Sequence, residues 1–172
     1  MSIITSGIDL LCADLARSGG LKEIHLANID DVTTFTLAGG LYTSVTMVGG
    51  KVFFKFEFER DTAEWRETVS KENRSVLVTE ELEFFEPKPN QSRRDILQCI
   101  AESCGLIGIV TTFNGESWVI GFTEASGKDR PLELVTDTQL TGKALTDLNG
   151  TTIILGTTDK EKALTFTGTI PI

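Results

Sequence analysis

The chain has 172 residues, 40% hydrophobic and 24% charged, with a formal net charge of -9. This composition is typical of a folded protein, and the length predicts one domain that can bury a sizeable core. The negative charge argues against sequence-specific nucleic-acid binding, which needs Lys and Arg to neutralise phosphates. The sequence contains no apolar run of membrane-spanning length, and its first residues lack the basic start and cleavage site of a signal peptide.

Residues 1–20 are predicted to form an N-terminal arm or short helix, separate from a single domain over residues 21–172. Ile8, Leu11 and Leu15 recur at helical spacing, and Gly19-Gly20 ends the pattern. A meander of short antiparallel strands should follow, because glycine pairs at 39–40 and 49–50 separate segments that alternate between polar and apolar residues. These segments are residues 21–27, 32–37 and 41–48, with a turn at 28–31.

Residues 51–87 are predicted to form a long hairpin. The sequence KVFFKFEFER alternates with period two, which places Val52, Phe54, Phe56 and Phe58 on a buried face and Phe53 with the charged residues on the other. A continuous strand over residues 52–70 would run roughly 60 Å, whereas a compact chain of this length is roughly 40 Å across. The strand must therefore break, most plausibly at Asp61-Thr62, or project beyond its domain. A turn at residues 71–74 leads into the returning strand.

One helix is predicted over residues 92–104. Ser92 can act as its N-cap with Asp95 three residues on, and Gly105 can end it. Its apolar stripe contains Ile96, Leu97, Ile100, Ala101 and Cys104. Arg93 and Arg94 lie at the unfavourable end of the helix dipole, so we expect them to face a carboxylate on another element or subunit.

Strands return after the helix, at residues 106–113 and 117–123 around an Asn114-Gly115 turn. A third hairpin is predicted from residues 131–138 and 141–146, after a loop at 125–130. Strands at 151–155 and 164–170, separated by a charged loop at 157–162, end the chain. The expected fold is mainly β: an antiparallel β-sandwich or partly closed barrel with one flanking α-helix and a long projecting β-hairpin.

Candidate catalytic groups are few. His25 is the single histidine and has no nucleophile motif beside it, so a structural or surface role is predicted. Glu81 and Glu83 alternate with Glu80 and Glu86, which favours a solvated strand face over a catalytic or metal-binding pair. The spacing of Cys12, Cys99 and Cys104 matches no zinc pattern, and buried thiols folded in a reducing cytoplasm are expected. We therefore expect no enzymatic activity, no metal and no cofactor.

The order of elements resembles that of bacteriophage tail tube proteins, a family shared with the tubes of contractile injection systems. The resemblance covers roughly residues 19–169: LKEIHLANIDDVTTF after Gly19-Gly20, the 51–87 hairpin, the 93–104 helix, then IVTTFNGESWVIGF and a Thr-rich end. It implies a β-sandwich with one helix that forms hexameric rings, and these rings stack into a hollow tube through which DNA passes. It also implies a place in the virion tail, assembly in the host cytoplasm without a membrane, and sheath, terminator or baseplate proteins as partners.

In that family an extended hairpin helps to build the inner barrel, and an acidic lumen would repel DNA phosphates. Lys51, Lys55 and Arg66 interrupt the acidic pattern here, so some charges are expected to pair between subunits. Two alternatives stay open: another ring-forming tail component (terminator, baseplate hub or neck protein), or a small-ligand-binding β-barrel with a pocket near Trp118, His25 or the Glu cluster. The candidate lumen or subunit-interface residues are Glu57, Glu59, Glu64, Glu67, Glu81, Glu83, Arg66, Arg93, Arg94 and Trp65.

Overall fold

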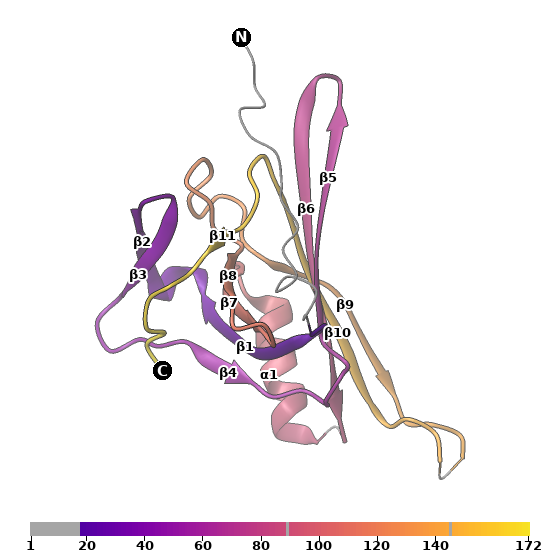
Figure 1. Cartoon of the computed structure of the whole chain (residues 1–172). Coiled ribbons are helices and arrows are strands. Elements are labelled where there is room, and N and C mark those ends of the chain that lie inside the picture. The colour runs from indigo at the N-terminus through magenta and orange to yellow at the C-terminus, as the bar shows by residue number, and fades with distance from the viewer. Residues whose placement is uncertain (1–17, 89, 145) are drawn as a thin grey trace.

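A computed structural model describes residues 18–88, 90–144 and 146–172, so most of the predicted N-terminal arm lies outside the described residues. The fold is mainly β, with antiparallel sheets that do not close into a barrel and one helix, which confirms the sandwich class (Figure 1). No helix in the described part of the chain is long and apolar enough to cross a membrane.

The central sheet has five strands in the order β11-β8-β7-β1-β4. Both of its faces are buried, because one core packs on each side. Strand β7 therefore reads as the apolar run LIGIV. Leu106 and Val110 face one core, called here the first core, while Ile107 and Ile109 face the other, called the second core. The strands are β1 (Leu21–Asn28), β4 (Phe54–Phe56), β7 (Leu106–Thr112), β8 (Ser117–Ile120) and β11 (Leu164–Thr165).

A two-stranded hairpin covers one face of the central sheet. It consists of β2 (Val32–Ala38) and β3 (Leu41–Met47), which follow the short 3-10 helix η2 (Ile29–Asp31). The hairpin contributes aromatic side chains to the core. The centroid of the Phe35 ring lies 5.2 Å from that of Tyr42 and 4.9 Å from that of Phe122. The predicted strands and the turn at Gly39-Gly40 are confirmed, but the three-stranded meander is not. β2 and β3 pair with each other, whereas β1 pairs with β4 and β7 in the central sheet.

A second sheet, called here the outer sheet, covers the other face. Its order is β5-β6-β10-β9, from β5 (Glu64–Glu72), β6 (Ser75–Pro87), β9 (Glu133–Leu140) and β10 (Gly150–Asp159). Its inner face packs on the central sheet through Leu82, Phe84, Ile153 and Leu155. Its outer face is turned away from both cores.

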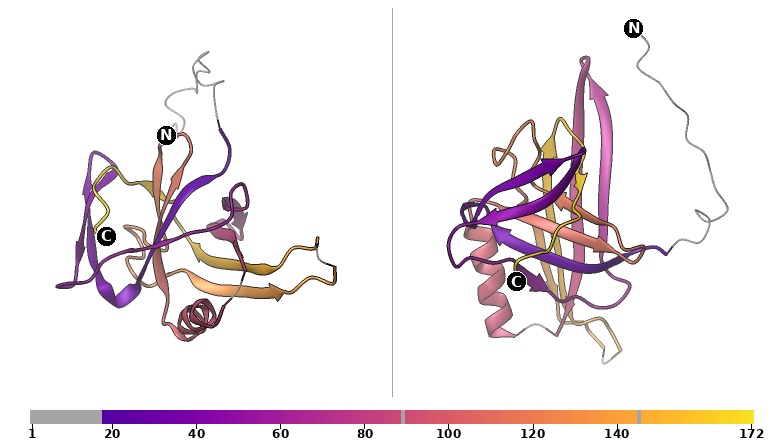
Figure 2. Two further views of the ribbon diagram at one scale, coloured as in Figure 1. Left: turned by 90° about the horizontal axis from the view of Figure 1, so that it is seen from below. Right: turned by 60° about the vertical axis from the view of Figure 1, so that its left-hand side comes forward.

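The hairpin of β5 and β6 projects beyond the rest of the molecule (Figures 1 and 2). The turn lies where the sequence predicts it: Glu72 pairs with Ser75, and Asn73 and Arg74 both have positive φ, 47° and 68°. Such a pair is typical of the type I′ turn, whose twist matches that of the strands. The predicted break is also confirmed, because a turn at Asp61 (φ 61°) ends the segment before β5 begins.

The prediction of which face of the 51–59 segment is buried is wrong. Only Phe54–Phe56 forms a strand, and Phe53 is buried with 1% exposure whereas Phe54 is 57% exposed. Phe53 enters the second core because its backbone N–H bonds to Pro171 O, which anchors the chain one residue before the short edge strand. Phe56 and Phe58 pack at the margin of the first core.

Helix α1 (Gln91–Glu102) lies against the first core through Leu97 and Ile100. Its N-cap is Asn90, not Ser92, because the Asn90 side chain accepts the Arg93 N–H at 3.0 Å. The predicted stripe is narrower than expected: Ile96, Ala101 and Cys104 are exposed. Cys99 is exposed too, so two of the three predicted buried thiols are on the surface, and Cys12 lies outside the described residues.

The predicted third hairpin also needs correction. β9 pairs with β10, and no strand is found at the described residues within 141–146. β10 runs on to Asp159 into the predicted 157–162 loop, since its partner β6 is 13 residues long and continues to pair with it through Val78. Strand β11 is only Leu164–Thr165, much shorter than the predicted 164–170.

Candidate functional site

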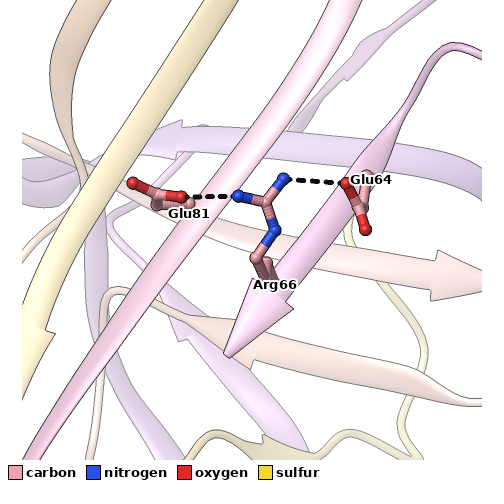
Figure 3. A network of polar contacts seen from close by, with 3 residues as sticks. All are labelled: Glu64, Arg66 and Glu81. Carbon is pink, nitrogen blue, oxygen red and sulfur yellow. Dashed lines mark hydrogen bonds and ion pairs between the residues drawn. The ribbon is translucent and has the colours of Figure 1, made fainter. Parts of the chain in front are cut away.

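The outer face of the outer sheet carries a cluster of carboxylates around one guanidinium. Arg66 lies opposite Glu81 across the β5–β6 ladder, and Glu64 lies opposite Glu83, so all four side chains point to the same side. The Arg66 guanidinium bonds Glu64 Oε2 at 2.9 Å and Glu81 Oε2 at 3.1 Å (Figure 3). The cluster keeps a net negative charge. Because the hydrogen bond to Glu64 and the acidic surroundings favour the charged form, the pKa of Arg66 is raised.

The same face continues over β9. Glu133 pairs with Gly156, which in turn pairs with Glu81, so Glu133 extends the acidic surface across three strands. Val135 is 60% exposed beside it, at a register shift in the β9–β10 ladder. We call Glu64, Arg66, Glu81, Glu83 and Glu133 the acidic face.

Both edges of the outer sheet are open in the described part of the chain. β5 ends the sheet on one side and β9 on the other, and each pairs on one side only. Their outward N–H and C=O groups are therefore available to another strand.

Glu67 and Trp65 point the other way, onto the inner face. Glu67 accepts a hydrogen bond from Ala163 N at 2.9 Å and lies 3.8 Å from Lys162 Nζ. The Trp65 ring lies 5.6 Å from Trp118, so these two residues join the sheets as anchors within one subunit. They do not belong to the acidic face.

Glu57 and Glu59 lie in the exposed segment between β4 and β5, outside the strands of the outer sheet, and the Glu59 N–H bonds Phe85 O at the edge of β6. Arg93 finds a carboxylate on another element, as predicted: its Nε lies 3.1 Å from Glu86 Oε1, and its Nη1 donates to Pro87 O at 2.7 Å. Arg94 is exposed, and its described hydrogen bond is made by the backbone, from its N–H to Asn90 O.

A groove of about 690 Å³ lies between α1, β4 and the end of β6. Its floor is apolar, with Leu26, Phe84, Ile100 and Ile153, and its rim carries charged side chains including Glu57, Glu86, Arg93 and Asp95. Neither Trp118 nor His25 lines it, whereas Glu86 of the predicted Glu cluster does. The groove has no sequence motif, because its walls come from six segments that are separate in the sequence.

The burial of one carboxyl group, that of Glu80, was not predicted from the sequence. Glu80 is 2% exposed on the inner face of β6, opposite Glu67, and accepts a hydrogen bond from Gly121 N at 3.3 Å. Burial raises its pKa to about 7. The solvated-face prediction is thus wrong for Glu80, although the split of the Glu residues between two faces is correct. Its register with Val78, Leu82 and Phe84 was the signal that could have placed it inside.

Among the described residues, no group of three or more His, Cys, Asp or Glu side chains is arranged to hold a metal ion. His25 is 3% exposed in β1, between Lys55 on β4 and Ile109 on β7, and burial lowers its pKa. This environment fits the structural role expected of it. Comparison with protein-family models, with curated proteins and with solved structures finds no match.

Proposed function

We propose that this protein is a structural tube subunit of the phage tail kind, which assembles side by side into rings and conducts DNA through their centre. The observation that carries the proposal is the outer sheet: open at both edges, extended by a projecting hairpin, and acidic on its free face. These three properties belong to one element, so a single mode of association accounts for all of them.

Lateral association uses the edges. β5 of one copy can pair with β9 of the next, which satisfies main-chain groups that would otherwise promote uncontrolled aggregation. This contact is heterologous, because it joins two different surfaces, and it generates a closed ring if the rotation between copies closes. Six copies are the number implied by the resemblance to tail tube proteins.

The acidic face then lines the lumen. Glu64, Glu81, Glu83 and Glu133 of each copy would present a repeated negative surface to the phosphates of DNA. Repulsion prevents adhesion, so the nucleic acid slides. Sheath, terminator or baseplate proteins are the expected partners, and the virion tail is the expected location.

The test is negative-stain electron microscopy of the purified, concentrated protein, with its mass measured by light scattering. Hollow tubes or sixfold rings are expected. A protein that remains monomeric at high concentration contradicts the proposal. Finite rings that never stack would instead favour a terminator, hub or neck role.

The second candidate function is binding of a small apolar ligand, and the groove between α1 and β4 favours it. A ligand that binds only the native state raises the unfolding temperature. A thermal-shift screen with apolar metabolites measures this directly, and stabilisation of a protein that stays monomeric would support this candidate over the tube.

A further inference from the structure

The tip of the β5–β6 hairpin carries an apolar surface that the subunit itself does not cover. Val69 and Val76 are each 46% exposed, and they lie on the inner face, in register with buried Val78 and with Lys71. They continue the apolar stripe of Leu82 and Val78 past the end of the body, where the hairpin projects alone (Figure 2). Among the described residues, nothing packs over this end of the stripe.

The groove lies at the opposite end of the same strand. Its lining includes Phe84 and Glu86, whereas the turn of the hairpin is at Asn73-Arg74. Phe84 lies 11 positions after Asn73, which corresponds to roughly 35 Å of extended chain. The groove also contains exposed apolar groups, since Phe54 is 57% and Ile96 52% exposed.

We infer that the hairpin tip of one copy docks in the groove between α1 and β4 of the next copy, a head-to-tail contact that stacks subunits along the strand direction. The inference rests on the proposed tube function and names the surfaces through which rings would stack. The occupant of the groove is a second copy of this chain.

The relative position of the hairpin tip and the groove supports a second copy of the chain as the occupant. The tip valines and the groove lie on the same side of the outer sheet, the side that faces α1, and at opposite ends of β6. Copies in the same orientation, displaced along the strands, therefore bring tip toward groove without inverting one of them. A contact between two different surfaces that does not close extends into a filament.

Charge supports it as well. The tip presents Lys71 and Arg74, both exposed, with Glu72 as its one acid. On the rim of the groove, Arg93 is paired with Glu86, and Lys55 with Glu23. Glu57 and Asp95 form no ion pair among the described residues, so they remain to meet the cations of the tip.

The groove wall contains an exposed thiol, Cys99, which allows a direct test. In a Cys12→Ser/Cys104→Ser background of the full chain, we would introduce Val76→Cys and oxidise mildly at assembly concentration. A tip-to-groove contact gives a ladder of covalent multimers on a non-reducing gel, because each copy contributes one donor and one acceptor site. A tip-to-tip contact stops at dimers.

The control variant adds Cys99→Ser, which must abolish the ladder. A second control places the new thiol at Val48, which is 45% exposed and lies outside both surfaces. Absence of the ladder from the test variant under conditions in which tubes form would overturn the inference, and so would a ladder that survives Cys99→Ser.

An assembly experiment without cross-linking tests this inference separately from the proposed function. Val69→Thr/Val76→Thr should raise the concentration needed for stacking roughly tenfold or more, while single rings persist and Val48→Thr behaves as wild type. Unchanged stacking of the double variant overturns the inference and leaves the tube standing. Head-to-tail chains without rings in the wild type would support the contact and overturn the tube.

Discussion

Glu80 is a buried carboxyl between the two sheets, and its titration makes the free energy of unfolding depend on pH. Its Oε2 accepts the Gly121 N–H from the end of β8, while Glu67 lies opposite it and Asp159 adds further negative charge. Burial is the main reason that its pKa rises from 4.5 to about 7, and the two acidic neighbours act in the same direction.

The first prediction follows from the sign of this shift. The folded protein keeps the Glu80 proton up to about pH 7, whereas the unfolded chain releases it near 4.5. The free energy of unfolding therefore falls as pH rises between these values, by about 3 kcal/mol from this group, and is flat above both. Glu80→Gln keeps an acceptor for Gly121 and should remove that part of the loss. Urea unfolding at pH 4.5 and pH 8 measures it.

Glu83→Gln is the control, because Glu83 lies on the same strand but on the outer face. It should leave the pH dependence near that of the wild type. If wild type and Glu80→Gln lose the same stability between the two pH values, Glu80 is not the buried acid described above.

The second prediction concerns neighbouring phenylalanines. Phe53→Ala should lower the free energy of unfolding by about 3–5 kcal/mol, because the ring is 1% exposed in the second core. Phe54→Ala should cost below about 1 kcal/mol, because that ring is 57% exposed. Urea unfolding of both variants at a concentration that prevents assembly compares them. The reverse order would restore the face assignment that period two predicted.

At the scale of elements, the β5–β6 turn has a residue that does not suit its backbone. Arg74 has φ 68°, a region that glycine adopts without steric cost, and Asn-Gly is the preferred pair in this turn. The third prediction is that Arg74→Gly raises the free energy of unfolding by about 0.5–1 kcal/mol. Arg74→Ala removes the same charge and should give no such gain; an equal gain in both would assign the effect to charge. Hydrogen exchange at Val69 and Val76, read for all three proteins, locates the effect in the hairpin.

Strand alternation and turn residues predicted most of the elements. The glycine pairs, Asn114-Gly115 and the 71–74 turn each separate real strands, because these signals depend on local backbone geometry. The errors lie where long-range contacts decide. Phe53 is drawn inward by the chain end at Pro171, and β10 is long because β6 offers a long partner.

Among the candidate site residues, too, local pattern predicted some features, and long-range contacts decided the others. Alternation placed Glu81 and Glu83 on the face opposite Glu80 and Glu86 correctly, since register follows from period two. Which of the two faces is buried is indicated by Val78, Leu82 and Phe84, the apolar residues that share the face of Glu80. The groove could not be predicted from the sequence, because β1, β4, β6 and α1 meet there only in the folded chain.

At the scale of the whole molecule, the arrangement of charge matters more than its sum. The net charge is -9, yet four carboxylates gather on one sheet face around a single arginine. A ring that turns this face inward multiplies the local field by the number of copies, because all copies present the same surface to one space. Soluble acidic proteins without such convergence repel DNA only weakly at physiological salt.

The last prediction tests this convergence. Glu81→Lys/Glu83→Lys changes the net charge of each copy by +4, as does Glu102→Lys/Glu116→Lys, but only the first pair lies on the acidic face, and Glu102 and Glu116 are exposed outside both the acidic face and the groove. Assembled protein with the first pair should retain double-stranded DNA, with a binding constant that falls steeply as salt rises. Assembled protein with the second pair should behave like the wild type. Fluorescence anisotropy of labelled DNA across a salt series compares the three proteins. Equal DNA binding by both variants would mean that net charge, and not an inward acidic face, governs the interaction.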